Sequence, residues 1–156
     1  MKQLFKIISD SDFFYDGGVF TCTFYCLTGK GAFPDDQWTD FAQTVLSWWA
    51  DEVAYAAIQD ETTFRFLFED GPFWIDAIKK GDQVHLYYKS GKGCVSRFDG
   101  ICIMETTVSF IEIVRELTRA TRHLASMLYL AGHIQDSLAT NEIASKIAKL
   151  DQRLRS

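Results

Sequence analysis

The sequence predicts an α+β fold, in which an antiparallel meander sheet packs against an amphipathic helix of the N-terminal half and one or two C-terminal helices. Apolar residues recur at spacings of three and four between residues 36 and 58, which is the period of a helix. Strand-like runs divided by glycine-containing turns follow as far as residue 105. A second helical period starts after residue 107. At 156 residues, the chain is expected to form a single domain, 1–156.

Two strands are expected before the first helix. Residues 4–8 predict a short strand, and residues 19–28 predict a longer one. The alternation in the longer run places four residues on one face: Phe20, Cys22, Phe24 and Cys26. Cysteines four residues apart in a strand lie about 13 Å apart, which is too far for a disulfide. Since Cys94 and Cys102 form no CxxC pattern either, we expect reduced thiols and no metal site.

The clearest predicted helix covers residues 36–58. Pro34, Asp35 and Asp36 resemble a helix start, because acidic side chains are favourable near the positive end of the helix dipole. The apolar stripe that follows consists of Trp38, Phe41, Ala42, Val45, Trp48, Trp49, Val53 and Ala56. Trp48 and Trp49 are adjacent and point about 100° apart on a helix, so one of them is expected near the surface.

The stretch FRFLFEDGPFWID, residues 64–76, predicts two strands joined by a turn. Asp70 followed by Gly71 is a turn signal, because glycine adopts positive φ without strain. A pair of catalytic acids, Glu69 and Asp70, is the alternative interpretation of this stretch. Such a pair needs two different environments to separate the pKa values of its carboxyls. Both residues are expected to face water, so the turn is the favoured interpretation.

The remaining elements follow in order. Residues 83–89 predict a strand, and residues 94–105 predict one or two more. Ser109 and Glu112 match the capping box of a helix that starts there. Gly132 is expected to weaken or end that helix, and a second apolar stripe is expected to restart at Thr140.

The sequence lacks the motifs of the common catalytic and nucleotide-binding classes. Gly29-Lys30 and Gly91-Lys92 are each followed by glycine and not by the Ser or Thr of a phosphate-binding loop. No HExxH or GxSxG motif is present. We therefore expect no enzyme, with no catalytic residues, no metal and no cofactor.

Charge and hydropathy bear on the partners and the compartment. The sequence pI of about 5.1 argues against nucleic acid, and the arginines at positions 115, 119 and 122 are expected to form a solvated face. No apolar run reaches the roughly 18 residues that a membrane span needs. The N-terminal apolar stretch is also too short for a secretory signal, so we expect a cytoplasmic protein that contacts no membrane.

The distribution of charge points to a cationic partner. The net charge is −5, yet residues 31–78 contain ten acidic residues and a single basic one, Arg65. Phe73 and Trp74 are expected on opposite faces of a strand, so one of them should be near the surface. An exposed tryptophan beside carboxylates is a good anchor for a protein interface, where Trp contributes strongly to binding energy.

Two stretches, FPDDQWTDFAQTVLSWWADEV and FLFEDGPFWI, resemble bacterial immunity proteins, the cognate inhibitors of contact-dependent growth inhibition and other polymorphic toxins. The resemblance covers residues 33–78. It implies tight binding to a cationic toxin domain, often a basic nuclease, with occlusion of its active site. The sequence makes no prediction of oligomeric state. The expected partner-binding residues are Asp35, Asp36, Trp48, Asp51, Glu52, Glu69, Asp70 and Trp74.

Two alternatives remain open. In the first alternative, the protein is an enzyme or a small-molecule-binding domain. Its pocket lies between the sheet and the helices, where His85, Tyr87 and Arg97 supply polar groups. In the second, it is an adaptor or chaperone subunit of a secretion machine, which predicts exposed apolar surface on the C-terminal helices.

Overall fold

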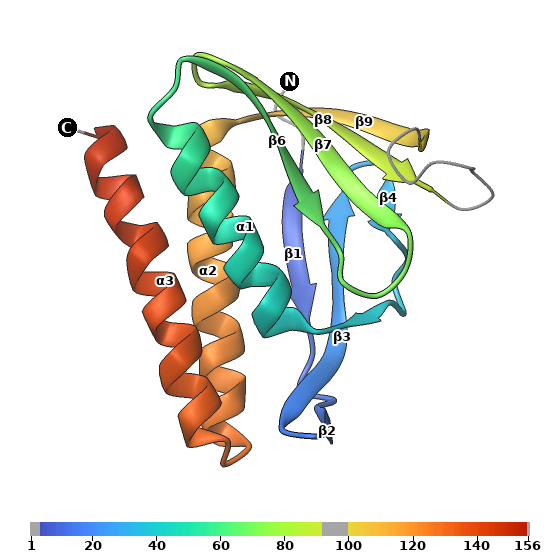
Figure 1. Ribbon diagram of the computed structural model, residues 1–156, viewed down its shortest axis with the longest axis vertical. Helices are drawn as coiled ribbons and strands as arrows, with labels where there is room; N and C mark the ends of the chain where they lie inside the picture. The colour runs from blue at the N-terminus through green and yellow to red at the C-terminus, as the bar shows by residue number, and fades with distance from the viewer. Residues whose placement is uncertain (1–3, 92–99, 156) are drawn as a thin grey trace.

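The computed structural model describes residues 4–91 and 100–155, which form the α+β fold that the sequence predicts (Figure 1). Two antiparallel sheets and three α-helices make up the described part of the chain. The helices lie along one side of the molecule, and the second sheet crosses one end of the first (Figure 1).

The first sheet is built around one long strand, β3 (Val19–Thr28). Its buried residues alternate as predicted, with Phe20, Cys22, Phe24 and Cys26 in the core. Four shorter strands pair antiparallel with it: β1 (Phe5–Ser9), β2 (Phe14–Asp16), β4 (Gly31–Phe33) and β5 (Thr39–Asp40). The predicted strand at residues 4–8 is β1, shifted by one residue.

The second sheet is the predicted meander. Its strands follow one another in sequence order: β6 (Glu61–Leu67), β7 (Phe73–Lys80), β8 (Gln83–Ser90) and β9 (Ile101–Ser109). Gly71 has a φ of 91° in the connection between β6 and β7, which confirms the turn expected there. Cys94 and the start of the strand predicted at 94–105 lie outside the described residues.

The two C-terminal helices form a hairpin, α2 (Phe110–Leu130) and α3 (Ile134–Arg155). The Ser109 hydroxyl accepts a hydrogen bond of 3.2 Å from the Glu112 amide, as the capping motif predicts. At the other end of α2, Gly132 has a φ of 86°. The Gly132 amide donates to Tyr129 and the next amide, of His133, donates to Leu128, which is a Schellman motif.

The prediction that the last helix starts at Thr140 is wrong, because α3 already begins at Ile134. Thr140 is buried inside the helix, and its hydroxyl donates backwards to the Asp136 carbonyl at 2.7 Å. A threonine hydroxyl can satisfy either a helix start or a carbonyl one turn earlier, so the residue type alone does not distinguish the two.

The start of the first helix is also corrected: α1 (Ala42–Ala57) begins six residues later than predicted. The chain before it pairs with β3 instead, through β5 and through a hydrogen bond of 2.9 Å from the Phe24 amide to the Trp38 carbonyl. This pairing satisfies the backbone groups that a longer helix would have used. Asp35, Asp36 and Trp38 therefore lie in a turn and not on the helix.

One hydrophobic cluster joins both sheets and all three helices. Aromatic rings occupy its centre: the Trp49 ring lies 4.8 Å from Phe66 and 5.3 Å from Phe68 between centroids, and Phe68 also contacts Phe33 and Phe24. These rings fill the space between α1 and the two sheets.

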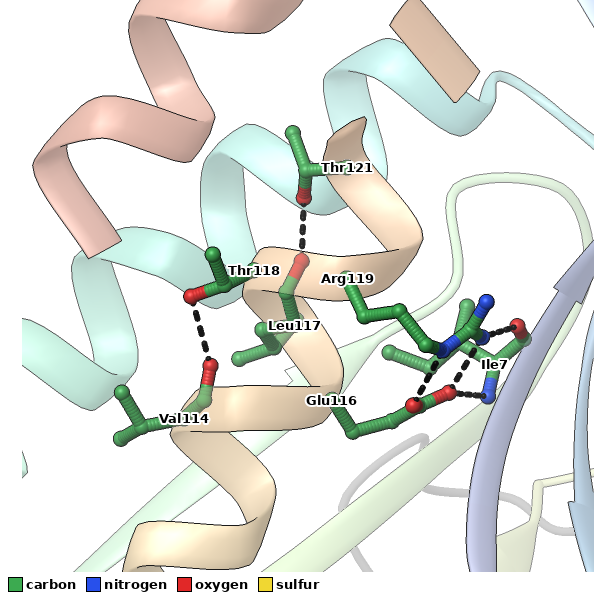
Figure 2. Close-up of polar contacts among 7 residues, drawn as sticks. All are labelled: Ile7, Val114, Glu116, Leu117, Thr118, Arg119 and Thr121. Carbon is green, nitrogen blue, oxygen red and sulfur yellow. Dashed lines mark hydrogen bonds and ion pairs between the residues drawn. The ribbon is translucent and has the colours of Figure 1, made fainter. Parts of the chain in front are cut away.

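The edge strand β1 is attached to α2 by an ion pair (Figure 2). The Glu116 carboxylate accepts a hydrogen bond of 2.6 Å from the Ile7 amide, and the Arg119 guanidinium donates to the Ile7 carbonyl at 2.9 Å. Arg119 also pairs with Glu116 at 2.6 Å. Together the two side chains occupy the position of a neighbouring strand and cover part of the open edge of β1.

Candidate functional site

A surface cleft of about 410 Å³ brings together three of the predicted partner-binding carboxylates. Its lining residues are Asp35, Asp36, Gln37, Trp38, Thr39 and Asp70. Within the described part of the chain, no ion pair joins Asp35, Asp36 or Asp70 to a basic side chain. The cleft therefore brings together three carboxylates that no basic side chain of the described residues neutralises.

The turn that holds Asp35 and Asp36 is fixed by local hydrogen bonds. The Gln37 amide donates to the Asp35 carboxylate at 2.8 Å, and the Trp38 amide donates to the Asp35 carbonyl at 3.3 Å. Trp38 is half-buried and packs edge-on against the Phe73 ring, with 5.1 Å between centroids. Its indole therefore forms a rigid wall of the cleft.

The connection between β6 and β7 supplies the rest of the lining, through Asp70. Glu69 and Asp70 are both exposed there, as the turn interpretation expects. A Cβ atom on Gly71 would lie 2.7 Å from the Trp38 ring, which shows how closely this turn approaches the indole. Asp70 lines the cleft, whereas Glu69 lies beside it on the same turn and is not among its lining residues.

Asp40 lies behind the cleft and is fully buried, with 0% of its surface exposed. Its carboxylate accepts hydrogen bonds from the Trp38 indole at 3.0 Å, from the Phe41 amide at 2.7 Å and from the Asp70 amide at 3.2 Å. Burial raises the pKa of Asp40, and the nearby Asp70 charge adds to the increase, although these hydrogen bonds oppose it. Asp40 is not among the residues that the sequence predicts to bind a partner.

Helix α1 carries a second group of predicted residues. Trp48 is 40% exposed and Trp49 is 0% exposed, so one of the two is near the surface, as expected. Asp51 and Tyr55 are exposed at spacings of three and seven residues from Trp48, which places all three on one face of the helix. Trp48, Asp51 and Tyr55 thus form an aromatic-acidic stripe, called here the α1 stripe.

Glu52 does not belong to the α1 stripe in its contacts. One of its carboxylate oxygens accepts a hydrogen bond of 3.2 Å from the Arg65 amide. Because β6 is an edge strand, this contact satisfies a backbone donor that would otherwise be open. Glu52 therefore has a structural partner within the protein.

Trp74 is 2% exposed, so the expectation that it offers an exposed indole is wrong. Its indole N–H donates to the Asp76 carboxylate at 3.1 Å, and the Arg65 guanidinium carbon lies 5.4 Å from its ring centroid. Gly91 and Gly100 approach the ring so closely that a Cβ on either would contact it. The alternation along β7 predicted opposite faces for Phe73 and Trp74, but it did not show that Gly91 and Gly100 cover the Trp74 ring.

Asp76 differs from the cleft carboxylates because basic residues neutralise it. Arg65 pairs with it at 2.6 Å and Lys89 pairs with it at 3.0 Å. Burial alone would raise the pKa of Asp76, but hydrogen bonds from Arg65, Lys89 and Trp74 outweigh burial and hold the pKa below its usual value. Asp76 on the second sheet is therefore neutralised, whereas the carboxylates around Trp38 have no ion pair among the described residues.

The alternative pocket between sheet and helices is filled by the hydrophobic core. His85 and Tyr87 alternate with the buried residues Val84, Leu86 and Tyr88, so they lie on the outer face of the sheet. Their rings stack at 4.5 Å. A cavity of about 650 Å³ on this outer face includes Tyr87, together with Arg65, Asp76 and Lys89. Arg97, the third proposed polar group, lies outside the described residues.

Exposed apolar residues gather at the end of the molecule that holds the α2–α3 turn. Strand β2 reaches the same end, where the Tyr15 hydroxyl donates to Asp136 at 2.7 Å (Figure 1). The exposed apolar residues of these elements are Phe14, Tyr129, Leu130, Ile134 and Leu138. This is the exposed apolar surface that the secretion-adaptor alternative predicts.

Comparison of the chain with protein-family models, with curated proteins and with solved structures found no match. Among residues 4–91 and 100–155, none of the helices has the length and apolar character to cross a membrane. The same residues contain no group of three or more His, Cys, Asp or Glu side chains placed to hold a metal ion.

Proposed function

We propose that this protein is an immunity protein that binds a cationic toxin domain through the cleft around Trp38 and neutralises it by covering its active site. The observation that carries the proposal is the convergence of Asp35, Asp36 and Asp70 on one half-buried indole. The proposed activity is binding and not catalysis.

The cleft suits a lysine or arginine side chain of the partner. Three carboxylates supply negative potential, and the indole face attracts a cation through its quadrupole. A single exposed ion pair contributes about 0–1 kcal/mol, which is too little for a specific complex. Several carboxylates beside one aromatic wall contribute more, because their charges act together on one cation and the cleft lowers the effective dielectric constant around it.

The same charges favour fast association. Complementary potentials steer a cationic partner to the cleft and raise the association rate, and salt screens this effect. The α1 stripe extends the proposed surface, because α1 begins directly after β5 and Trp48 lies about two turns into it. Its exposed tryptophan and tyrosine are residue types that slow dissociation when a partner buries them.

A binding titration against the protein encoded immediately upstream tests the proposal. We expect sub-micromolar affinity that weakens as salt is raised, together with loss of the toxin's activity in the complex. Asp36→Lys should weaken binding at least tenfold, mainly through slower association. Glu142→Lys makes the same charge change on an exposed position of α3 and serves as the matched control.

Two results would contradict the proposal. One is a folded wild-type protein that does not bind the upstream protein. The other is equal weakening by Asp36→Lys and Glu142→Lys, which would show a general charge effect and no role for the cleft.

The exposed apolar end supports a second candidate, a secretion adaptor that holds an apolar segment of its client at the α2–α3 turn. Tyr129 and Leu130 are 62% and 84% exposed at the end of α2. The double substitution Tyr129→Ser and Leu130→Ser should abolish client binding in that case, whereas Asp36→Lys should leave it unchanged. The opposite pattern favours the immunity protein.

A further inference from the structure

We propose that Asp40 is a positioning residue whose ionised carboxylate joins the two halves of the acidic cleft, and that its protonation loosens this connection. The effect of Asp40 on the shape of the cleft is a property of the free protein. Its consequence for partner binding rests on the immunity function proposed above.

The cleft is assembled from both sheets. Asp35, Asp36 and Trp38 belong to the segment that is attached to β3 through β5, in which Asp40 pairs with Cys22 and Thr39 pairs with Thr23. Asp70 belongs to the turn between β6 and β7 of the second sheet. The relative position of the three carboxylates therefore depends on whatever connects these two sheets at this point.

Asp40 makes the polar part of that connection, beside the packing of the Trp38 ring on Phe73 and the Gly71 turn. The Asp70 amide lies 3.2 Å from the Asp40 Oδ1 and 3.3 Å from its Oδ2. The turn of the second sheet is therefore hydrogen-bonded to a carboxylate of the first sheet. Oδ1 also accepts from the Phe41 amide, and Oδ2 also accepts from the Trp38 indole. One side chain thus fixes the start of α1, the indole wall and the Asp70 wall.

This arrangement requires an ionised carboxylate. Each oxygen faces N–H donors, and an ionised carboxylate is an acceptor at both oxygens. A protonated carboxyl would direct an O–H toward one of the three donors, so at least one hydrogen bond would be lost. The bonds from Trp38 and Asp70 are longer than the bond of 2.7 Å from Phe41, so we expect the loss to fall on one of these two. Protonation is therefore expected to loosen one wall of the cleft.

The surroundings of Asp40 favour proton uptake. The groups that face it from the packed elements are the Asp70 carboxylate on the turn and the Cys22 thiol on β3, and Asp10 and Asp12 act on that thiol from beyond. Among the described residues, no ion pair places a basic side chain on Asp40. Burial and the Asp70 charge together raise the pKa of Asp40 above 3.8, so it takes up a proton before full acidification.

The sign of the stability effect separates this local change from unfolding. Because the pKa of Asp40 is higher in the folded protein than in the unfolded chain, the folded state binds this proton more tightly. Protonation of Asp40 therefore does not by itself drive unfolding. We expect the cleft to open in a protein whose core remains intact.

Nuclear magnetic resonance of the free protein tests the inference. The indole N–H of Trp38, assigned with Trp38→Phe, and the backbone N–H of Asp70 are followed from about pH 7 to about pH 3. We expect both signals to shift with one shared midpoint above 3.8, equal to the midpoint of the Asp40 carboxyl carbon. Asp40→Asn should remove this shared transition and displace the indole signal at every pH.

Asp36→Asn is the matched control, since it removes a carboxylate from the same cleft and leaves Asp40 in place. It should retain the shared transition. The inference is overturned if the two N–H signals do not titrate together, or if Asp36→Asn abolishes their transition.

Trp38→Phe keeps the test valid should Asp40→Asn fail to fold. It removes one donor from Asp40, so the carboxyl midpoint should rise above that of the wild type while the Asp70 amide still titrates with it. An unchanged carboxyl midpoint in Trp38→Phe would contradict the inference.

Partner binding is measured separately and distinguishes the two proposals. A shared transition without any binding of the upstream protein would defeat the immunity function and leave the role of Asp40 intact. Strong binding without a shared transition would defeat the role of Asp40 alone.

Discussion

The backbone amide of Ile7 donates a hydrogen bond of 2.6 Å to the carboxylate of Glu116, a residue 109 positions later in the chain (Figure 2). Arg119 completes the contact by donating to the Ile7 carbonyl. Substitution Glu116→Ala removes the acceptor and leaves Arg119 without its carboxylate. We expect the free energy of unfolding to fall by about 1–3 kcal/mol, the usual cost of an unsatisfied buried donor.

Urea denaturation monitored by tryptophan fluorescence measures this change. Arg122→Ala provides the control, because Arg122 is exposed on the same helix and should alter stability by less than about 0.5 kcal/mol. Equal effects of the two substitutions would show that the contact with Ile7 contributes nothing.

Truncation of the two adjacent tryptophans of α1 should lower the stability of the protein by very different amounts. Trp49 is fully buried, and its indole donates to the Leu67 carbonyl at 2.8 Å. Trp49→Ala should therefore destabilise the protein by about 3–5 kcal/mol. Trp48→Ala should change stability by less than about 1 kcal/mol and weaken binding of the proposed partner. Thermal unfolding and the binding titration check both results, and strong destabilisation by Trp48→Ala would contradict the assignment.

Gly71 is expected to tolerate alanine less well than Gly81. Both have positive φ, 91° and 60°, so each substitution costs about 1–2 kcal/mol of backbone strain. An added Cβ at Gly71 would also approach the Trp38 ring to 2.7 Å, whereas nothing lies within 4 Å at Gly81. Gly71→Ala should lower the midpoint of denaturation further and change the fluorescence of Trp38. Equal midpoints for the two variants would argue against close packing of the turn on the indole.

Stability should depend on pH through Asp76. Its pKa is lower in the folded protein than in the unfolded chain, so the ionised form contributes stability that is present above 3.8 and is lost as pH falls through the lower folded value. Asp76→Asn should therefore be less stable than the wild type at about pH 7, and this difference should shrink toward about pH 3. Denaturation series at both pH values measure it, and a constant difference would show that the ion pairs are not its source.

Local patterns predicted most of the secondary structure. Strand β3 has the predicted bounds because its alternation extends over the whole element. The cap at Ser109 and the turn at Gly71 were also predicted, since each depends on residues close in sequence. The starts of α1 and α3 were missed where a local signal had a competing partner. The chain before α1 is taken up by pairing with β3, and the Thr140 hydroxyl bonds backwards within α3.

The candidate site was only partly predictable. Acidic residues were identified as a class, and the unequal exposure of Trp48 and Trp49 followed from helix geometry. The ion pairs that distinguish Asp76 from the other carboxylates were not predicted, because Lys89 reaches Asp76 from a neighbouring strand. The burial of Trp74 depends on Gly91 and Gly100, which lie against its ring from a distant part of the chain.

By itself, the sequence determined the α+β class, the meander and the concentration of negative charge between residues 31 and 78, because these depend on composition and on periodicity along the chain. Only the tertiary structure decided which carboxylates share a cleft. Asp35 lies in the segment attached to the first sheet, and Asp70 lies on a turn of the second sheet. Both line one cleft because Asp40, next to β3, accepts a hydrogen bond from the Asp70 amide. Such a contact joins backbone and side-chain groups 30 residues apart, and no local pattern encodes that distance.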